Sequence, residues 1–141
     1  MQLTSHTRAL GIDIGSTTVK LSLVGPGGVE YTKYERHFSQ VRGKTLELVR
    51  EIRPLLEAEP FTVAISGSAG MGVAEAANLP FVQEVYATGE AVKRLEPDTS
   101  VVIELGGEDA KVSFYDGGVD ERMNGSCAGG TGLSLTKWRF C

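Results

Sequence analysis

Hydrophobic and polar positions alternate in short runs over the first and last thirds of the chain and follow a helical spacing in parts of its middle. Alternation with a period of two predicts β-strands, whereas apolar residues at i, i+4, i+7 and i+8 predict one face of a helix. The predicted strands lie at residues 9–14, 18–24, 29–37, 61–70, 101–107, 110–118 and 119–125, some of them running into a glycine turn. The predicted helices begin near residue 43, with Leu48, Ile52, Leu55 and Leu56 on one face, and at residues 72–77 and 84–96. Pro54 is expected to kink the first helix or end its regular part near Arg53.

Two stretches of the chain repeat one order of residue types. IDIGSTTVKLSLVGPGG, from residue 12, and IELGGEDAKVSFYDGG, from residue 103, each contain an apolar strand, an acid, a glycine turn, a lysine, a second strand and a second glycine turn. An acid followed by glycine brings a carboxylate and unobstructed backbone N–H groups to one place, where turn amides can bind an anion. Carboxylates also suit Mg²⁺ that is shared with substrate phosphates. The repeat therefore favours two hairpins that hold a polyphosphate, although each alone is equally consistent with an ordinary tight turn.

Composition narrows the classes of function. The 141 residues carry a formal net charge of −4, which provides no basic field for nucleic acid or an anionic membrane. No stretch reaches the roughly 20 apolar residues of a membrane span, and the N-terminus lacks a signal-peptide core. Only two cysteines, Cys127 and Cys141, are present, which is unlike a secreted disulfide scaffold. We therefore expect a cytoplasmic protein with no nucleic-acid partner and no membrane segment.

Several other residues have ordinary structural interpretations. The stretch RGKT at 42–45 lacks the P-loop glycine five positions before Gly43, where Phe38 stands, so it is predicted to start a helix. His6 and His37 lack metal-ligand spacing to one another and are interpreted as surface or strand residues.

Three ordered motifs connect the chain to a known family. GIDIGSTTVK at 11–20 and ELGGEDAK at 104–111 resemble the first and second phosphate motifs of the actin, sugar-kinase and chaperone-type ATPase superfamily. With NGSCAGGTG at 124–132, the chain resembles activators of 2-hydroxyacyl-CoA dehydratases and the related ATPase subunits of benzoyl-CoA reductase. FVQEVYATGEAV at 81–92 and Glu104 look more like the long multidomain members. The resemblance implies an α/β, actin-like ATPase (ribonuclease-H-like) fold, with a mixed five-stranded sheet over residues 9–67 and a truncated second half.

The resemblance also implies roles for individual residues. Asp13 would hold Mg²⁺, mostly through water, and Glu104 would lie near the metal or the attacking water. The residues implied to bind ATP are Gly15, Ser16, Thr17, Thr18 and Lys20 in the first motif and Gly106, Gly107, Asp109 and Lys111 in the second. Cys127 would be one ligand of a [4Fe-4S] cluster shared by a homodimer in which each subunit supplies two cysteines. ATP hydrolysis would then drive delivery of a low-potential electron to a dehydratase or related reductase.

The family pattern ends shortly after its third motif. Residues 1–97 are interpreted as the first ATPase subdomain, 98–132 as the opening hairpins of the second, and 133–141 as a tail that does not match the family. A frameshift or a truncated reading frame would explain that tail. We therefore expect weak or no ATP hydrolysis and no stable cluster in this chain. Two alternatives stay open, a sugar or acyl kinase of the same superfamily and an inactive fragment.

Overall fold

The computed structural model describes residues 7–107, 110–116 and 120–123. The chain divides into two units, Met1–Glu84 and Val85–Cys141. The sequence places a boundary at 97/98 instead, and that prediction remains untested.

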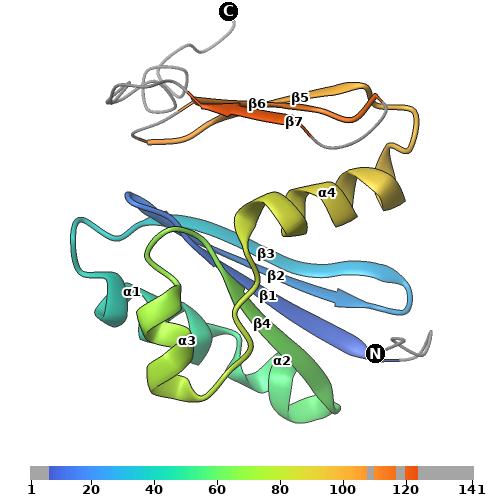
Figure 1. The fold of residues 1–141 in the computed structure, drawn as a ribbon. Helices are drawn as coiled ribbons and strands as arrows, with labels where there is room; N and C mark the ends of the chain where they lie inside the picture. The colour runs from blue at the N-terminus through green and yellow to red at the C-terminus, as the bar shows by residue number, and fades with distance from the viewer. Residues whose placement is uncertain (1–6, 108–109, 117–119, 124–141) are drawn as a thin grey trace, which may run out of the picture. The chain divides into compact units, whose positions relative to one another are not determined.

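The first unit is built on a mixed sheet (Figure 1). Its strands are β1 (Arg8–Ile14), β2 (Thr18–Gly25), β3 (Gly28–Arg36) and β4 (Phe61–Ser66), in the spatial order β3-β2-β1-β4. The first three strands form an antiparallel meander, and β4 runs parallel to β1. The strands predicted from alternation are therefore confirmed to within a few residues at their ends.

The predicted count of five strands in this sheet is wrong by one. Beyond β4, the described residues form a single isolated bridge, between Ile65 and Phe81. Pro80 has no N–H to donate, and the chain enters the next helix at Glu84, so too few residues remain to extend the pairing.

Three helices of the first unit cover one face of this sheet (Figure 1). They are α1 (Val41–Glu51), α2 (Arg53–Ala58) and α3 (Met71–Ala77). Ile52 separates α1 from α2, and Pro54 stands in the first turn of α2, which confirms the predicted interruption near Arg53. The core lies between the helices and the sheet and consists of Leu10, Ile12, Ile14, Val19, Leu21, Leu23, Leu48, Ile52, Ile65 and Ala74.

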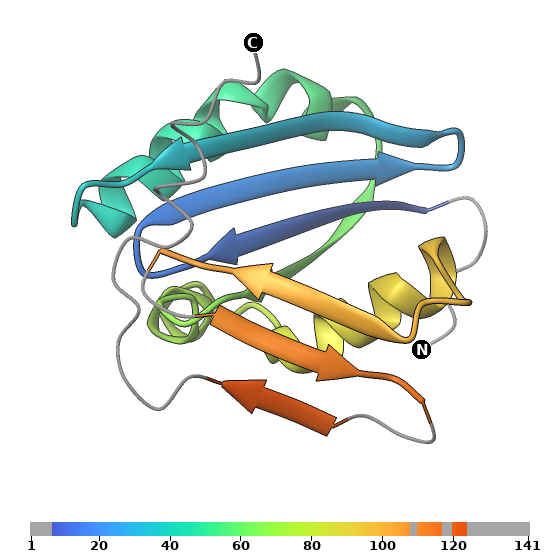
Figure 2. The same ribbon diagram turned by 90° about the horizontal axis from the view of Figure 1, so that it is seen from above.

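The second unit contains a helix and an antiparallel three-stranded sheet, whose strands are visible face-on in Figure 2. Its elements are α4 (Glu84–Leu95), β5 (Val101–Leu105), β6 (Ala110–Phe114) and β7 (Asp120–Met123). The predicted helix at 84–96 and the predicted second meander are confirmed, within the described residues. Thr88 on α4 donates a hydrogen bond to Glu104 on β5, which connects this helix to the sheet.

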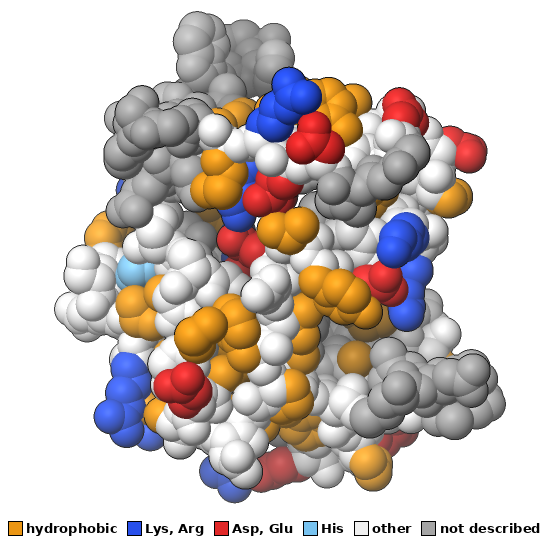
Figure 3. Space-filling model, viewed as in Figure 1, with side chains coloured by type: hydrophobic (Ala, Val, Ile, Leu, Met, Phe, Trp, Pro, Cys, Tyr) orange, Lys and Arg blue, Asp and Glu red, His pale blue; other side chains and the backbone are white. Residues whose placement is uncertain are grey.

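The surface carries charges of both signs. On the face shown in Figure 3, basic and acidic side chains are interspersed. Within residues 7–107, 110–116 and 120–123, no helix is long and apolar enough to cross a membrane.

Candidate functional site

The turn between β1 and β2 is the centre of the candidate site. Residues 15–18 form this turn, in which the Gly15 N–H donates to the Thr18 carbonyl oxygen at an N···O distance of 2.9 Å. Ser16 and Thr17 at its tip are half-buried, and Thr18 is buried at the start of β2. Within the described part of the chain, the backbone N–H groups of Ser16 and Thr17 have no hydrogen-bond acceptor. Two free amides in one tight turn are a suitable arrangement for binding an anion.

Asp13, near the end of β1, places a carboxylate beside this turn. It lies directly opposite Lys20 of β2, and the Lys20 Nζ contacts Asp13 Oδ2 at 2.6 Å. The Lys20 ammonium also lies 5.7 Å from the centre of the Tyr34 ring. The other oxygen, Asp13 Oδ1, is buried and has no hydrogen-bond partner among the described residues. An unpaired buried carboxylate oxygen is costly, and a cation or a water bound to one would remove that cost.

A glycine loop at residues 66–70, directly after β4, packs against the end of β1 next to the turn. The parallel pairing puts Ser66 beside Asp13, and the Ala69 N–H then donates to the Ile14 carbonyl oxygen at 2.9 Å. Gly67 has a φ of 95° and stands so close that a Cβ atom there would overlap the Ile14 carbonyl oxygen. Only glycine fits this approach, which makes residues 66–70 a part of the site that the sequence analysis did not assign.

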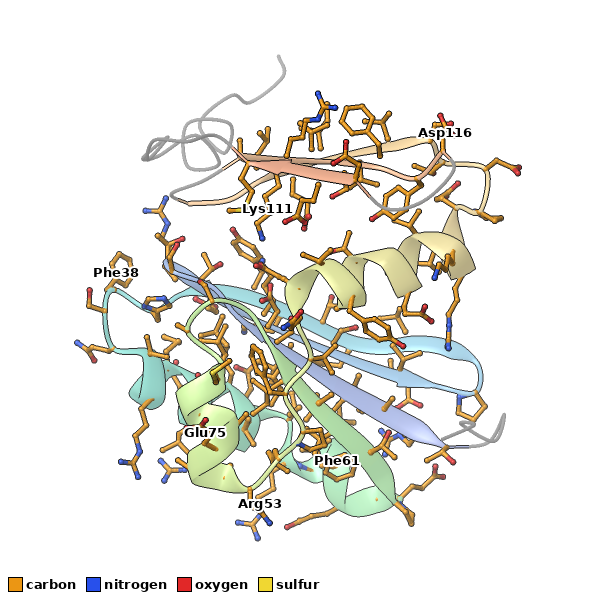
Figure 4. The ribbon with its side chains drawn as sticks, in the orientation of Figure 1. Phe38, Arg53, Phe61, Glu75, Lys111 and Asp116 are labelled. Carbon is orange, nitrogen blue, oxygen red and sulfur yellow. The ribbon has the colours of Figure 1, made fainter. Side chains whose placement is uncertain are left out.

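The second motif forms a hairpin of the same design. Glu104 on β5 lies directly opposite Lys111 on β6, as Asp13 lies opposite Lys20. Each hairpin has one further residue pair and a four-residue connection beyond the acid and the lysine, residues 15–18 in one and 106–109 in the other. The Thr88 hydroxyl donates to Glu104 Oε1 at 3.2 Å, and Lys111 is buried on β6 (Figure 4). The repeat seen in the sequence is therefore also a repeat of strand register.

Comparison with known proteins identifies the family of this chain. Residues 10–138 match the sequence model of the BadF/BadG/BcrA/BcrD ATPase family. The chain belongs to this family.

Two curated relatives are each about twice as long as the chain. An uncharacterised protein of Methanocaldococcus jannaschii is 30% identical over 91% of the chain and 53% of its own length. An uncharacterised protein of Escherichia coli is 32% identical over 90% of the chain and 50% of its own length. The chain thus spans about half the length of the curated relatives it matches.

Solved structures show the same fold. An activator of the 2-hydroxyisocaproyl-CoA dehydratase from Clostridium difficile, with bound ADPNP, superposes with a TM-score of 0.72 at 26% identity. That match covers 92% of this chain and 50% of the activator. Component A of the (R)-2-hydroxyglutaryl-CoA dehydratase from Acidaminococcus fermentans gives 0.73 at 23% identity, over 92% of this chain and 52% of component A. The predicted actin-like ATPase fold class and the predicted resemblance are both confirmed.

The residues present fit a magnesium ion in this ATPase-family chain. The Asp13 carboxylate has a buried unpaired oxygen, and the turn at residues 15–18, which carries hydroxyls and free amides, follows β1 directly. Within the described ranges no three His, Cys, Asp or Glu residues form a metal-binding group. One carboxylate is nevertheless the kind of protein contribution that Mg²⁺ needs when nucleotide phosphates and waters supply its other ligands.

The predicted site residues are distributed over both units. Those of the first motif are brought together around the β1–β2 turn. In the second motif Glu104, Gly106, Gly107 and Lys111 lie on or next to the β5–β6 hairpin. Asp109 and Cys127 lie outside the described residues, as do Cys141 and the tail at 133–141.

His37 is a functional candidate that the sequence analysis missed. It was interpreted as a surface or strand residue, but it lies just beyond β3 and is buried, with 4% of its surface exposed. Its ring contacts the Gly15 carbonyl oxygen at 3.1 Å. One signal for His37 was its position directly after a strand that pairs with β2. The register of this pairing, with Thr18 opposite Arg36, brings the next residue close to the β1–β2 turn.

Proposed function

We propose that this chain binds ATP with magnesium through the β1–β2 hairpin. Two observations carry the proposal, namely the buried, unpaired Asp13 Oδ1 and the free amides of Ser16 and Thr17 in the turn that follows β1. The carboxylate would hold the cation, mostly through water, while these amides and the hydroxyls of residues 16–18 would hold the phosphates. Lys20 would add a positive charge at the same place. The relative from Clostridium difficile with bound ADPNP supports this assignment.

The β5–β6 hairpin would supply the second set of phosphate contacts. Its connection contains Gly106 and Gly107, whose lack of side chains lets backbone amides approach a ligand closely. Glu104 would act near the metal or the attacking water, and the Thr88 hydroxyl would orient its carboxylate. Asp109 and Lys111 would complete this motif.

The intact protein is proposed to be an ATP-driven activator of a 2-hydroxyacyl-CoA dehydratase or a related reductase. Family membership and the structure of the dehydratase activator from Clostridium difficile support this function. Cys127 would provide one thiolate to a [4Fe-4S] cluster shared by a cytoplasmic homodimer, and the cluster would supply the low-potential electron. The half-length chain would retain nucleotide binding, with little or no hydrolysis.

Calorimetric titration of the chain with ATP and Mg²⁺ tests nucleotide binding. Wild type is expected to bind, and Asp13→Asn should weaken the affinity about tenfold or more, because the buried oxygen loses its charge. Asp116→Asn is the matched control, since it makes the same change at an exposed position (Figure 4). No binding by wild type, or equal affinities for the two variants, would disprove the proposal.

Electron transfer requires a separate test on the full-length protein. ATP-dependent reduction of a dehydratase partner should disappear in Cys127→Ser, whereas nucleotide affinity should stay unchanged. Transfer of a phosphoryl group to a sugar by wild type and variant alike would indicate a kinase instead.

A further inference from the structure

His37 makes hydrogen bonds through both of its ring nitrogens and both of its backbone polar groups. The ring Nε2 lies 3.1 Å from the Gly15 carbonyl oxygen, and the Ser39 N–H donates to Nδ1 at 3.1 Å. The His37 N–H donates to the Thr17 carbonyl oxygen at 3.1 Å, and its own carbonyl accepts from the Gln40 N–H at 2.7 Å. The residue therefore connects the β1–β2 turn to the start of α1.

The hydrogen-bond network assigns the tautomer of the ring. Because the Ser39 N–H is a donor, Nδ1 must offer a lone pair, and a neutral ring then carries its proton on Nε2. The Nε2–H can only donate to Gly15, whose carbonyl is an acceptor. Both ring nitrogens are thus matched to their partners in the neutral form.

The backbone around the ring is held in an unusual conformation. Phe38 and Ser39 have φ values of 45° and 63°, in the left-handed region that non-glycine residues rarely adopt. Burial of Phe38 does not offset this cost, since 75% of its surface is exposed and the side chain points outward (Figure 4). Such strain persists only where surrounding contacts enforce it, and here the Ser39 N–H is turned onto the His37 ring.

The contacts of His37 fix two peptide groups of the turn. In a trans peptide the C=O and the following N–H point in opposite directions. The bond to the Gly15 carbonyl therefore fixes the direction of the Ser16 N–H, which belongs to the same peptide. In the same way, the bond to the Thr17 carbonyl fixes the peptide between Thr17 and Thr18. A flip of the first of these peptides would replace an N–H with a carbonyl oxygen, which repels an anion.

We propose that His37 is a positioning residue that prevents this peptide flip and keeps the Ser16 N–H available to a polyanion. It acts through the Gly15 carbonyl and touches no substrate. The proposal rests on the proposed nucleotide binding, and it adds a residue outside the two phosphate motifs that sets the strength of that binding.

Two substitutions separate the functional contact from the structural one. In His37→Gln the side-chain amide nitrogen reaches as far as Nε2 and can still donate to the Gly15 carbonyl. In His37→Asn the amide oxygen takes the place of Nδ1 and keeps the bond from Ser39, but the donor to Gly15 is lost. Each variant keeps one of the two ring contacts, so a purely structural role predicts similar effects for both.

Nucleotide affinity is the first readout, measured by titrating the chain with ATP and Mg²⁺. We expect His37→Gln to lie within about threefold of wild type and His37→Asn to bind about tenfold more weakly, which corresponds to the loss of one hydrogen bond. Equal affinities for the two variants would overturn the proposal.

Nuclear magnetic resonance of the nucleotide-free chain is the second readout and does not depend on nucleotide. The wild-type ring should show the Nε2–H tautomer, and the Ser16 amide signal should broaden by exchange in His37→Asn but not in His37→Gln. If these signals behave as expected while wild type binds no ATP, the proposed function fails and the positioning role stands. An Nδ1–H tautomer in wild type overturns the positioning role, and this holds even if a variant does not fold.

Discussion

The two hairpins have the same register but different surroundings. In both, an acid lies opposite a lysine seven residues later, with a four-residue connection beyond them. Asp13 is flanked by the glycine loop at 66–70, whereas Glu104 accepts a hydrogen bond from a helix, through Thr88. A local sequence pattern thus determines strand pairing, while the chemical environment of each acid is set by segments distant in sequence.

The largest loss of stability is expected where Gly67 packs against the end of β1 in the first hairpin. Gly67→Ala would place a methyl group against the Ile14 carbonyl and force alanine to adopt a φ of 95°. We expect a loss of about 2–4 kcal/mol in the free energy of unfolding. Denaturant titration measures it, with Gly27→Ala as the control because nothing lies within 4 Å of a Cβ at that position. Equal midpoints for the two variants would show that the loop can move away.

A smaller loss of stability is expected from removing the hydrogen bond between Thr88 and Glu104 of the second hairpin. Thr88→Val keeps the shape of the side chain but removes the hydroxyl that donates to Glu104. The loss of one hydrogen bond to a carboxylate should cost about 1–2 kcal/mol, measured by thermal unfolding. Thr88→Ser retains the hydroxyl and should remain close to wild type. If Val and Ser behave alike, the contact contributes nothing to the environment of Glu104.

The smallest effect concerns the third strand of the first meander. Glu51 on α1 accepts hydrogen bonds from Lys33 at 3.0 Å and from Tyr31 at 2.9 Å, both on β3. These two bonds lower the pKa of Glu51, and the bond from Lys33 contributes most. A lowered folded-state pKa adds stability above the ordinary value, and this stability is lost as pH falls through the lowered one.

Glu51→Gln should therefore lower the melting temperature at about pH 7, and the difference should shrink as the pH falls below the ordinary carboxyl range. The exposure of these groups makes the expected shift smaller than those of the two preceding variants. On β7 of the second meander, Asp120→Asn at the exposed pair with Arg122 is the matched control. A difference between wild type and Glu51→Gln that persists unchanged in acid would contradict the assigned cause.

Strand positions and the repeated motif could be read from the sequence because each depends on short-range patterns. Alternation located β1 and β2, and the helical stripe with Pro54 located the break between α1 and α2. The free amides of the first turn follow from its local geometry in the same way.

The role of Gly67 could not be read in that way, and that of His37 needed the register of β3 on β2 in addition to the alternation. Gly67 acquires its role from parallel pairing across two helices, and His37 acquires its role from the position of the turn relative to the end of β3. Alternation along the chain gives neither the distance between Gly67 and β1 nor the distance between His37 and the β1–β2 turn. The missing fifth strand has a local cause, since Pro80 and the nearby start of α4 limit the pairing to one bridge.

The parallel pairing of β1 with β4 has a consequence for the order of folding. The β1–β2–β3 meander needs only short loops, which close within microseconds, whereas β4 must return across α1 and α2. Because the long connection from β3 to β4 closes more slowly than the short loops of the meander, the loop that contains Gly67 would reach Asp13 last. We therefore expect stopped-flow refolding to show nucleotide binding that develops only with the final kinetic phase. Occupation of the turn by a nucleotide would then report that the whole first unit has folded.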